Sequence, residues 1–291
     1  MQTKMKKTAL SNFTVFSKLL LFFLFTSSKS FSQDLKINVA LGASSYSGDL
    51  SSKIFYIKET EPAISLGISS EIATQFRLRL QYTYAGVNAS DGNSNREDLR
   101  KRNLRFFSKI SELSLLGEYD FSNSEDYYIY PYIFGGFGIF HFNPKTYYNG
   151  NVVELAKIGT EGQFLPGNPK GKGDTYNLTQ FNLTSGIGLR YHINEDSDLG
   201  FEFSYRKLFT DYLDDVHSSF YVKAEEFIKA NQKDALALSF RGYRDESKFN
   251  YSLPRGLNNN DSYYSFQIRY NHRLNFLTTD RKYGSYKVRF F

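Results

Sequence analysis

Eight separate segments of the chain alternate apolar and polar residues, and this alternation restricts the fold more than any other feature. In the last segment, Tyr264, Phe266 and Ile268 alternate with polar neighbours. A period of two predicts β-strands with one apolar and one polar face. The eight segments lie near 35–42, 64–72, 76–84, 112–121, 128–142, 182–193, 199–206 and 264–271. In the segment at 128–142 both faces are apolar, so the pattern leaves its orientation open.

The connections between these segments are alternately long and short. The long ones run roughly over 51–61, 88–106, 143–175 and 211–261, and the short ones lie near 74–75, 122–127 and 194–198. Outer-membrane barrels alternate long external loops with short periplasmic turns, and need strands of about 9–11 residues. A soluble lipocalin-like barrel would show the same alternation with the faces exchanged. The loop pattern favours an all-β, eight-stranded antiparallel up-and-down transmembrane β-barrel with long external loops over residues 33–276.

The first 32 residues differ from the rest of the chain. Lys4, Lys6, Lys7 and Lys18 precede an apolar run at 19–25, which is too short to span a bilayer as a helix. Small residues at 30 and 32 mark a cleavage point, so we expect a signal peptide over 1–32. The chain would then be exported to a bacterial outer membrane, with residues 277–291 forming a C-terminal periplasmic tail.

Loss of the signal peptide would remove most of the net charge. The formal charge of +6 would fall to +1, because this segment holds five lysines and no acidic residue. A nearly neutral mature chain with scattered basic residues argues against nucleic acid as a partner. Cysteine is absent, which excludes disulfides and thiolate sites.

If the apolar faces contact lipid, the polar faces must meet inside the barrel. The charged residues expected there are Lys36, Glu71, Arg77, Arg79, Glu112, Glu118, Arg190, Glu202, Arg206 and Arg269. An eight-stranded barrel is narrow enough for side chains to fill it, and buried charges require partners. We therefore expect a lumenal charge network that plugs the barrel, rather than a conducting pore or an active site.

The sequence offers little support for catalysis, a cofactor or a metal. It contains no H-E-x-x-H, G-x-S-x-G or phosphate-loop motif, and His141, His192, His217 and His272 lie far apart. The aspartates near 211–215 lack the spacing of a calcium loop, so hydrogen bonding within the loop or a helix start is favoured. The composition of 221–237 suits a short helix, and 159–169 favours turns. A lipid-modifying enzyme assembled from several strands is an open alternative.

Several short segments form a recognisable set. They lie at 46–50, 102–106, 131–138, 142–144, 160–163 and 205–216, and the last is the most specific. Their characteristic residues are Gly48, Asp49, Arg102, Asn103, Gly135, Gly136, Glu161, Gly162, Gln163, Asp211, Tyr212, Asp214 and Asp215. In these segments the chain resembles the PorG-like outer-membrane barrels associated with the type IX secretion system.

This resemblance implies a noncatalytic barrel surrounded by outer-membrane lipid and docked to periplasmic ring proteins of the secretion apparatus. The ring lies in the periplasm, so the short turns or the tail at 277–291 would make the contact. Two further interpretations stay open: a small barrel that binds or transports a ligand, and a structural barrel of unassigned role.

Overall fold

The computed structural model describes residues 35–51, 57–122, 127–166, 175–218, 220–243, 249–256 and 259–274. The signal peptide expected at 1–32 and the tail expected at 277–291 lie outside these residues.

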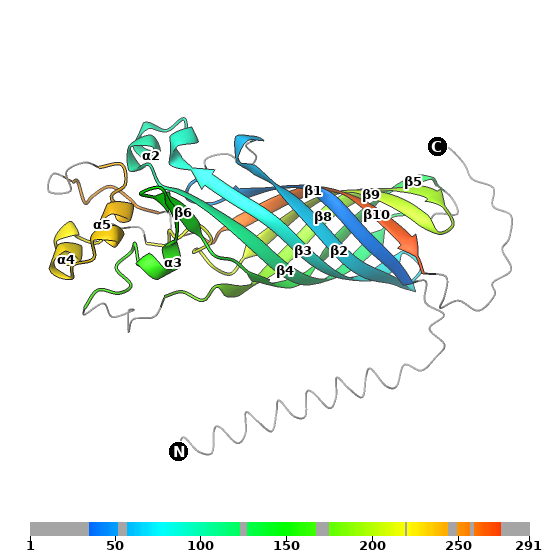
Figure 1. The fold of residues 1–291 in the computed structure, drawn as a ribbon. Helices are drawn as coiled ribbons and strands as arrows, with labels where there is room; N and C mark the ends of the chain where they lie inside the picture. The colour runs from blue at the N-terminus through cyan, green and yellow to red at the C-terminus, as the bar shows by residue number, and fades with distance from the viewer. Residues whose placement is uncertain are drawn as a thin grey trace, which may run out of the picture.

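Eight long antiparallel strands close into a barrel (Figure 1). They are β1 (Leu35–Ser47), β2 (Thr60–Ala73), β3 (Phe76–Ser90), β4 (Arg105–Asp120), β5 (Ile129–His141), β8 (Thr179–Asn194), β9 (Ser197–Leu208) and β10 (Ser262–Arg273). Each of these strands pairs with its neighbour in this order, and β1 pairs with β10 to close the wall. The predicted eight-stranded antiparallel barrel is confirmed.

The wall of the barrel is apolar outside and polar inside. Along β10, Phe266, Ile268 and Tyr270 are exposed, whereas the intervening Gln267 and Arg269 are buried. The other strands repeat this pattern with Leu, Ile, Phe and Tyr on their outer faces. A soluble barrel has the opposite polarity, so the exterior is suited to lipid.

β5 is the strand whose orientation the sequence left open. Tyr132 and Phe134 point inward and are buried, while Ile133 and Phe137 are exposed on the outer face. The strand passes very close to β4 at Gly136, where an added Cβ would lie 2.0 Å from the carbonyl oxygen of Leu115. Glycine at this position therefore allows the two strands to pair.

The long connections gather at one end of the barrel, here called the loop end, and the short turns at the other, the turn end (Figure 1). The loop end carries η1 (Ile57–Glu59), η2 (Asp91–Asn93), α2 (Glu97–Arg102), β6 (Lys145–Tyr148), β7 (Asn151–Glu154), α3 (Leu155–Ile158), α4 (Ala224–Lys229) and α5 (Lys233–Ser239). The helix expected within 221–237 is present as the pair α4 and α5. No helix of the described residues is long and apolar enough to cross a membrane.

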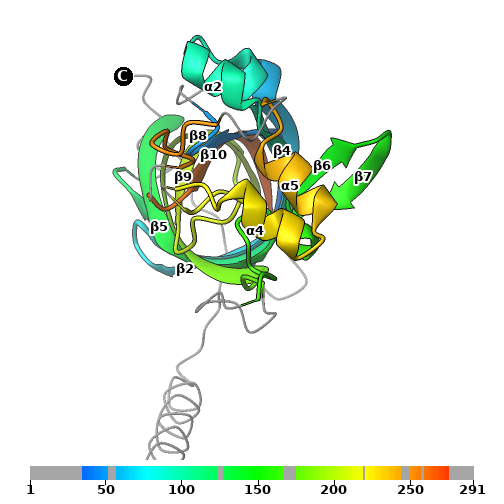
Figure 2. The ribbon, with the colours of Figure 1, turned by 90° about the vertical axis from the view of Figure 1, so that its left-hand side faces the viewer.

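The hairpin β6–β7 was not predicted from the sequence. Its turn residues Asn149 and Gly150 both have positive φ, at 49° and 79°, and Asn-Gly is a strong signal for such a two-residue turn. β6 pairs with β4 only at Phe107 and Lys145. The view onto the loop end shows that the hairpin projects beside the barrel wall (Figure 2).

Candidate functional site

The centre of the lumen is organised around the buried carboxylate of Glu202. Arg79 Nη1 lies 2.6 Å from Glu202 Oε1, and Arg269 Nη2 lies 2.7 Å from Oε2. The hydroxyl of Tyr132 donates to Glu202 Oε1 at 2.6 Å. Arg79 also lies 3.0 Å from Glu118, so charges of opposite sign alternate across the barrel. These side chains are almost fully buried in the interior of the barrel.

A second group of charges lies above this level, towards the loop end. Arg206 Nε donates to Glu112 Oε1 at 3.0 Å, and Tyr263 donates its hydroxyl to Glu112 Oε2 at 2.7 Å. Arg206 also donates to the hydroxyls of Ser204 and Ser265. Every member of this group is buried away from water. The ion pair between Arg206 and Glu112 therefore offsets part of the cost of burying the two charges.

A third group lies towards the turn end. Arg190 lies 2.7 Å from Glu118, 3.2 Å from Asp120 and 3.4 Å from Asp198. Lys36 contacts Asp198 at 2.6 Å, and Arg77 contacts Asp120 at 3.2 Å. The structure thus brings nine of the ten charges expected in the lumen into three groups, two of which share Glu118. The nine are Lys36, Arg77, Arg79, Glu112, Glu118, Arg190, Glu202, Arg206 and Arg269.

Glu71 is the residue of the expected set that lies elsewhere. It is exposed at the rim, and no ion pair joins it to another described residue. Two buried carboxylates that the expected set omitted, Asp120 and Asp198, take part instead. Asp120 continues the polar face of β4, so the alternation could have identified it. Asp198 falls where a turn was expected, because β9 begins earlier than its apolar pattern suggests.

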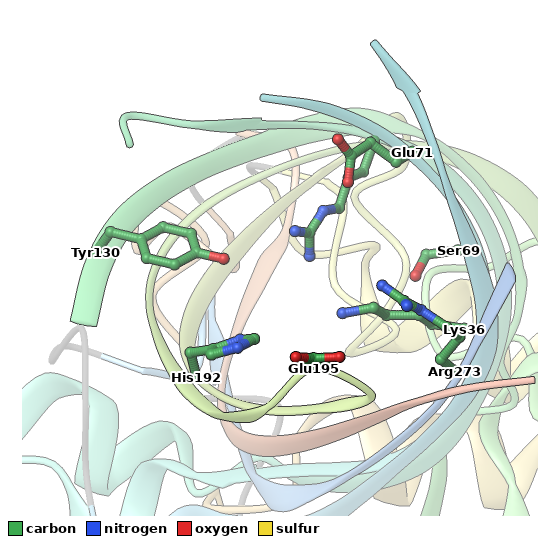
Figure 3. Close-up of a pocket in the computed structure, with 8 residues that line it drawn as sticks. Lys36, Ser69, Glu71, Tyr130, His192, Glu195 and Arg273 are labelled. Carbon is green, nitrogen blue, oxygen red and sulfur yellow. The ribbon is translucent and has the colours of Figure 1, made fainter. Parts of the chain in front are cut away.

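The turn end opens into a small polar pocket, shown in Figure 3. Its lining residues are Lys36, Ser69, Glu71, Arg77, Tyr130, His192, Glu195 and Arg273. Tyr130 is 2% exposed, and its hydroxyl points into the space (Figure 3). Below the pocket the third charge group closes the lumen. The pocket is therefore a shallow vestibule.

The loop end is closed by a packed cap with its own polar cluster. Tyr46 of β1 places its hydroxyl 2.6 Å from Asp214 Oδ2 and 2.9 Å from Asp261 Oδ1. A phenol has one proton to donate, and a proton on one of the carboxyl groups would let the second contact form as a full hydrogen bond. Burial raises the pKa of both Asp214 and Asp261 well above the usual range of aspartate. The Tyr46 contacts connect the 211–215 loop with β1 and with the residue before β10, and the raised pKa values favour a proton on one of the carboxyl groups.

Two arginines join the remaining loops of the cap. Arg102 forms a bidentate ion pair with Asp91, with both N···O distances at 2.7 Å, and donates to the carbonyl groups of Asp49 and Arg255. Arg255 in turn lies 3.3 Å from Glu161 and donates to Thr160. These contacts connect all four long loops, which fixes the cap as one unit.

The motif residues that support the family resemblance converge on this cap although they are far apart in the sequence. Asp49, Arg102, Glu161, Asp211, Tyr212, Asp214 and Asp215 belong to its polar or aromatic contacts. Gly48 allows the close approach, because an added Cβ would lie 2.1 Å from Tyr46 Oη and from Asp261 Oδ1. Asn103 ends α2 with a φ of 56°, Gly162 has a φ of 76°, and Gln163 accepts from the amide of Glu161. Gly135 and Gly136 lie apart, in β5 of the wall.

The cap should become less stable as the pH rises from about 4 to 8. Burial, together with Asp49 and Glu161, raises the pKa of Asp211 to about 8, and burial raises that of Asp215 to about 7. An unfolded loop releases these protons near pH 3.9. The folded cap therefore binds more protons between these values, and its stability falls with rising pH until both groups are ionised. Hydrogen exchange of the Leu213 and Val216 amides, corrected for intrinsic rates, should show decreasing protection.

The matched variant for this measurement is Asp215→Asn. Asp215 accepts from Thr160 and Tyr176 and has a φ of 68°, a conformation that asparagine tolerates. The variant removes one titrating group, so protection should depend less steeply on pH. The ring of His217 lies 3.2 Å from Asp211, and His217→Gln tests whether this contact contributes to the pH dependence. Protection that is constant from pH 5 to 8 would contradict the prediction.

The four histidines lie in different parts of the structure. They lie on β5, in the vestibule, in the cap and on β10. His272 Nδ1 lies 2.9 Å from Ser197 Oγ, but no carboxylate among the described residues contacts this ring. Among all residues that the structure describes, no three His, Cys, Asp or Glu side chains are arranged to hold a metal ion.

Similar solved structures include Neisserial surface protein A (NspA), at 9% identity and a TM-score of 0.44, covering 83% of this chain and 97% of that one. They also include the outer membrane protein OprG from Pseudomonas aeruginosa, at 10% identity and a TM-score of 0.39, covering 83% and 98%. A major outer membrane protein from Thermus thermophilus has 13% identity and a TM-score of 0.39, covering 82% and 99%.

No curated protein matches the chain in sequence. The family model described as "Domain of unknown function (DUF6089)" matches residues 14–158, which is just under half of the chain.

Proposed function

We propose that this protein is an integral component of a bacterial outer membrane and serves as a noncatalytic anchor in a type IX protein secretion apparatus. The observation that carries the anchoring role is the filled lumen. Three groups of buried, paired charges occupy the interior from Lys36 at the turn end to Arg206 near the cap. A barrel of this kind offers a rigid support in the membrane and no continuous aqueous path.

The membrane location is supported by the polarity of the wall. Every barrel strand presents exposed apolar side chains outward, as Leu66, Leu115 and Ile187 illustrate. A closed sheet satisfies its backbone hydrogen bonds internally, which a bilayer requires. The rule of long external loops and short periplasmic turns places the cap outside the cell and the vestibule in the periplasm.

The secretion role is supported by the motif resemblance and by where the motif residues lie. Arg102, Glu161 and Asp214 come from different loops, and their contacts hold one structure together. The motif residues therefore have structural roles in the cap, as expected if the motif set of the PorG-like barrels specifies an architecture. The cap and the periplasmic face lie at opposite ends, so a ring-docking surface would use residues outside most of these motifs.

Site-specific photo-crosslinking in intact cells tests the docking role. A photoreactive residue placed at Thr74 or Glu195, in two of the short turns, should form adducts with periplasmic ring proteins. The control position is Asn149, in the external hairpin. Gene deletion should also abolish secretion of type IX cargo. Normal secretion, together with no ring adduct from either turn, would refute the secretion role and leave the barrel unaffected.

Planar-bilayer recordings test the filled lumen separately. The folded wild-type protein should show no stable conductance, because long charged side chains occupy each level of the interior. A reproducible ion-selective channel would overturn the anchoring interpretation and favour transport.

A further inference from the structure

Two arginines at the loop end lie side by side and share an acceptor. Arg241 donates to Thr146 Oγ1 and to the carbonyl oxygen of Tyr147, both at 2.8 Å. Arg105 donates to the same carbonyl oxygen at 3.4 Å. Within the described part of the chain, neither guanidinium forms an ion pair with a carboxylate. Each guanidinium group also has N–H groups that donate no hydrogen bond to another described residue.

This pair differs from the two buried arginines of the cap. Arg102 is paired with Asp91 and Arg255 with Glu161. Burial, and then the neighbouring Arg105, lower the pKa of Arg241 to about 10. Two like charges held together are destabilising unless an anion lies between them. The pair therefore has the electrostatic character of an anion site.

The pair also lies on the face of the barrel that contacts lipid lower down. Arg105 shares the outward face of β4 with Phe107, Lys109, Leu113 and Leu115. Apart from Phe107, which packs against Tyr147, the outward apolar residues of β4 end near Ser111. A strand that rises about 3.3 Å per residue at a tilt near 40° places Arg105 about 15 Å beyond that level. The hairpin β6–β7, which supplies the acceptors Thr146 and Tyr147, projects beside the wall (Figure 2).

An aromatic surface completes the site. The guanidinium of Arg105 lies 5.9 Å from the centre of the Tyr147 ring, and the rings of Phe107 and Tyr147 lie 5.2 Å apart. Tyr147 is half exposed. An exposed ring beside two guanidinium groups suits a ligand that combines an anion with the apolar face of a sugar.

We propose that Arg105 and Arg241 bind a phosphate group on the sugar headgroup of an outer-leaflet glycolipid, with the Tyr147 ring against the sugar. Arginine forks match the geometry of phosphate. The headgroup layer of an ordinary bilayer is only about 5–8 Å thick on each side, so phospholipid phosphates lie below this height. Phosphorylated sugars extend further from the acyl chains. The inference rests on the outer-membrane location proposed above and is independent of the secretion role.

Binding to rough lipopolysaccharide, which lacks the O-polysaccharide, tests this site. The full-length mature protein is folded into phosphatidylcholine nanodiscs, and its affinity is measured for the native glycolipid, the enzymatically dephosphorylated glycolipid and inorganic phosphate. The wild type should bind the phosphorylated form at least tenfold more tightly than the dephosphorylated form. Arg105→Gln should lose at least tenfold in affinity for it, and Arg105→Gln combined with Arg241→Gln should lose more.

The matched control is Arg96→Gln, which removes an exposed arginine paired with Asp98 at the same end of the barrel. It should leave binding unchanged. Heat-modifiable mobility in gels verifies that each variant is folded, and Arg105→Gln alone keeps the test valid if Arg241→Gln impairs folding, because Arg105 is exposed.

The outcomes separate the possible ligands. Equal affinity for both glycolipids, or unchanged binding by Arg105→Gln, overturns the site. Binding of inorganic phosphate as tight as that of the glycolipid overturns the glycolipid assignment. A wild-type protein that does not insert into bilayers refutes the membrane location as well, whereas insertion with unselective binding refutes this inference alone.

Discussion

Glu202→Ala should lower the free energy of unfolding by about 3–5 kcal/mol, the usual cost of removing one partner from a buried ion pair. The carboxylate of Glu202 contacts both Arg79 and Arg269 and accepts from Tyr132. Its loss leaves Arg269 without an anion within 4 Å among the described residues and Arg79 with Glu118 alone. The desolvated positive charge in the middle of the barrel causes most of the expected loss.

Urea titration of the protein folded into lipid vesicles measures this effect. Glu202→Gln keeps an acceptor for Tyr132 but removes the charge, so it should be destabilised, though less than the alanine variant. Glu71→Ala is the matched control, because Glu71 is a charged residue of the same barrel that is exposed and lies outside the network. The control should change stability by less than about 1 kcal/mol. A loss below that value for Glu202→Ala would mean that the network contributes little to the closed barrel.

The sequence was sufficient to predict the wall of the barrel because both faces of each strand have strict requirements. Outward positions must be apolar and inward positions polar, so the period of two assigns a direction to most side chains. The inward placement of Arg79, Glu118 and Arg206 follows from this rule alone. The rule could not assign the faces of β5, because Tyr132 and Phe134 make the inner face of this strand aromatic as well.

The partners within the lumen and the cap could not be predicted in the same way. An inward position fixes the direction of a side chain but not its height in a tilted barrel, so Lys36 could not be assigned to Asp198, 162 positions away. The cap depends on contacts between four loops, and its central members Arg255 and Asp261 carry no local signal. The hairpin β6–β7 is different, since its Asn-Gly turn was visible in the sequence.

Arg102→Ala should open the cap while leaving the barrel folded. Arg102 is 5% exposed, pairs with Asp91, and donates to carbonyl groups in two other loops. Its removal leaves the fully buried carboxylate of Asp91 with only the amide of Leu104 as a donor among the described residues. We expect the free energy of opening the cap to fall by about 3–5 kcal/mol. The free energy of unfolding the barrel should change less, because the strands below retain their hydrogen bonds.

Limited proteolysis of intact cells measures this opening, since slow cleavage reports the population of the open form. Arg102→Ala should be cleaved in the external loops about a hundredfold to a few thousandfold faster than the wild type, because about 1.4 kcal/mol corresponds to a factor of ten. Arg102→Lys keeps the charge but not the bidentate geometry, so its cleavage rate should lie between those of the wild type and Arg102→Ala. Arg96→Ala removes an exposed pair and should change the rate only a few-fold. Wild-type resistance in Arg102→Ala would contradict a structural role for this motif residue and point instead to direct contact with a partner.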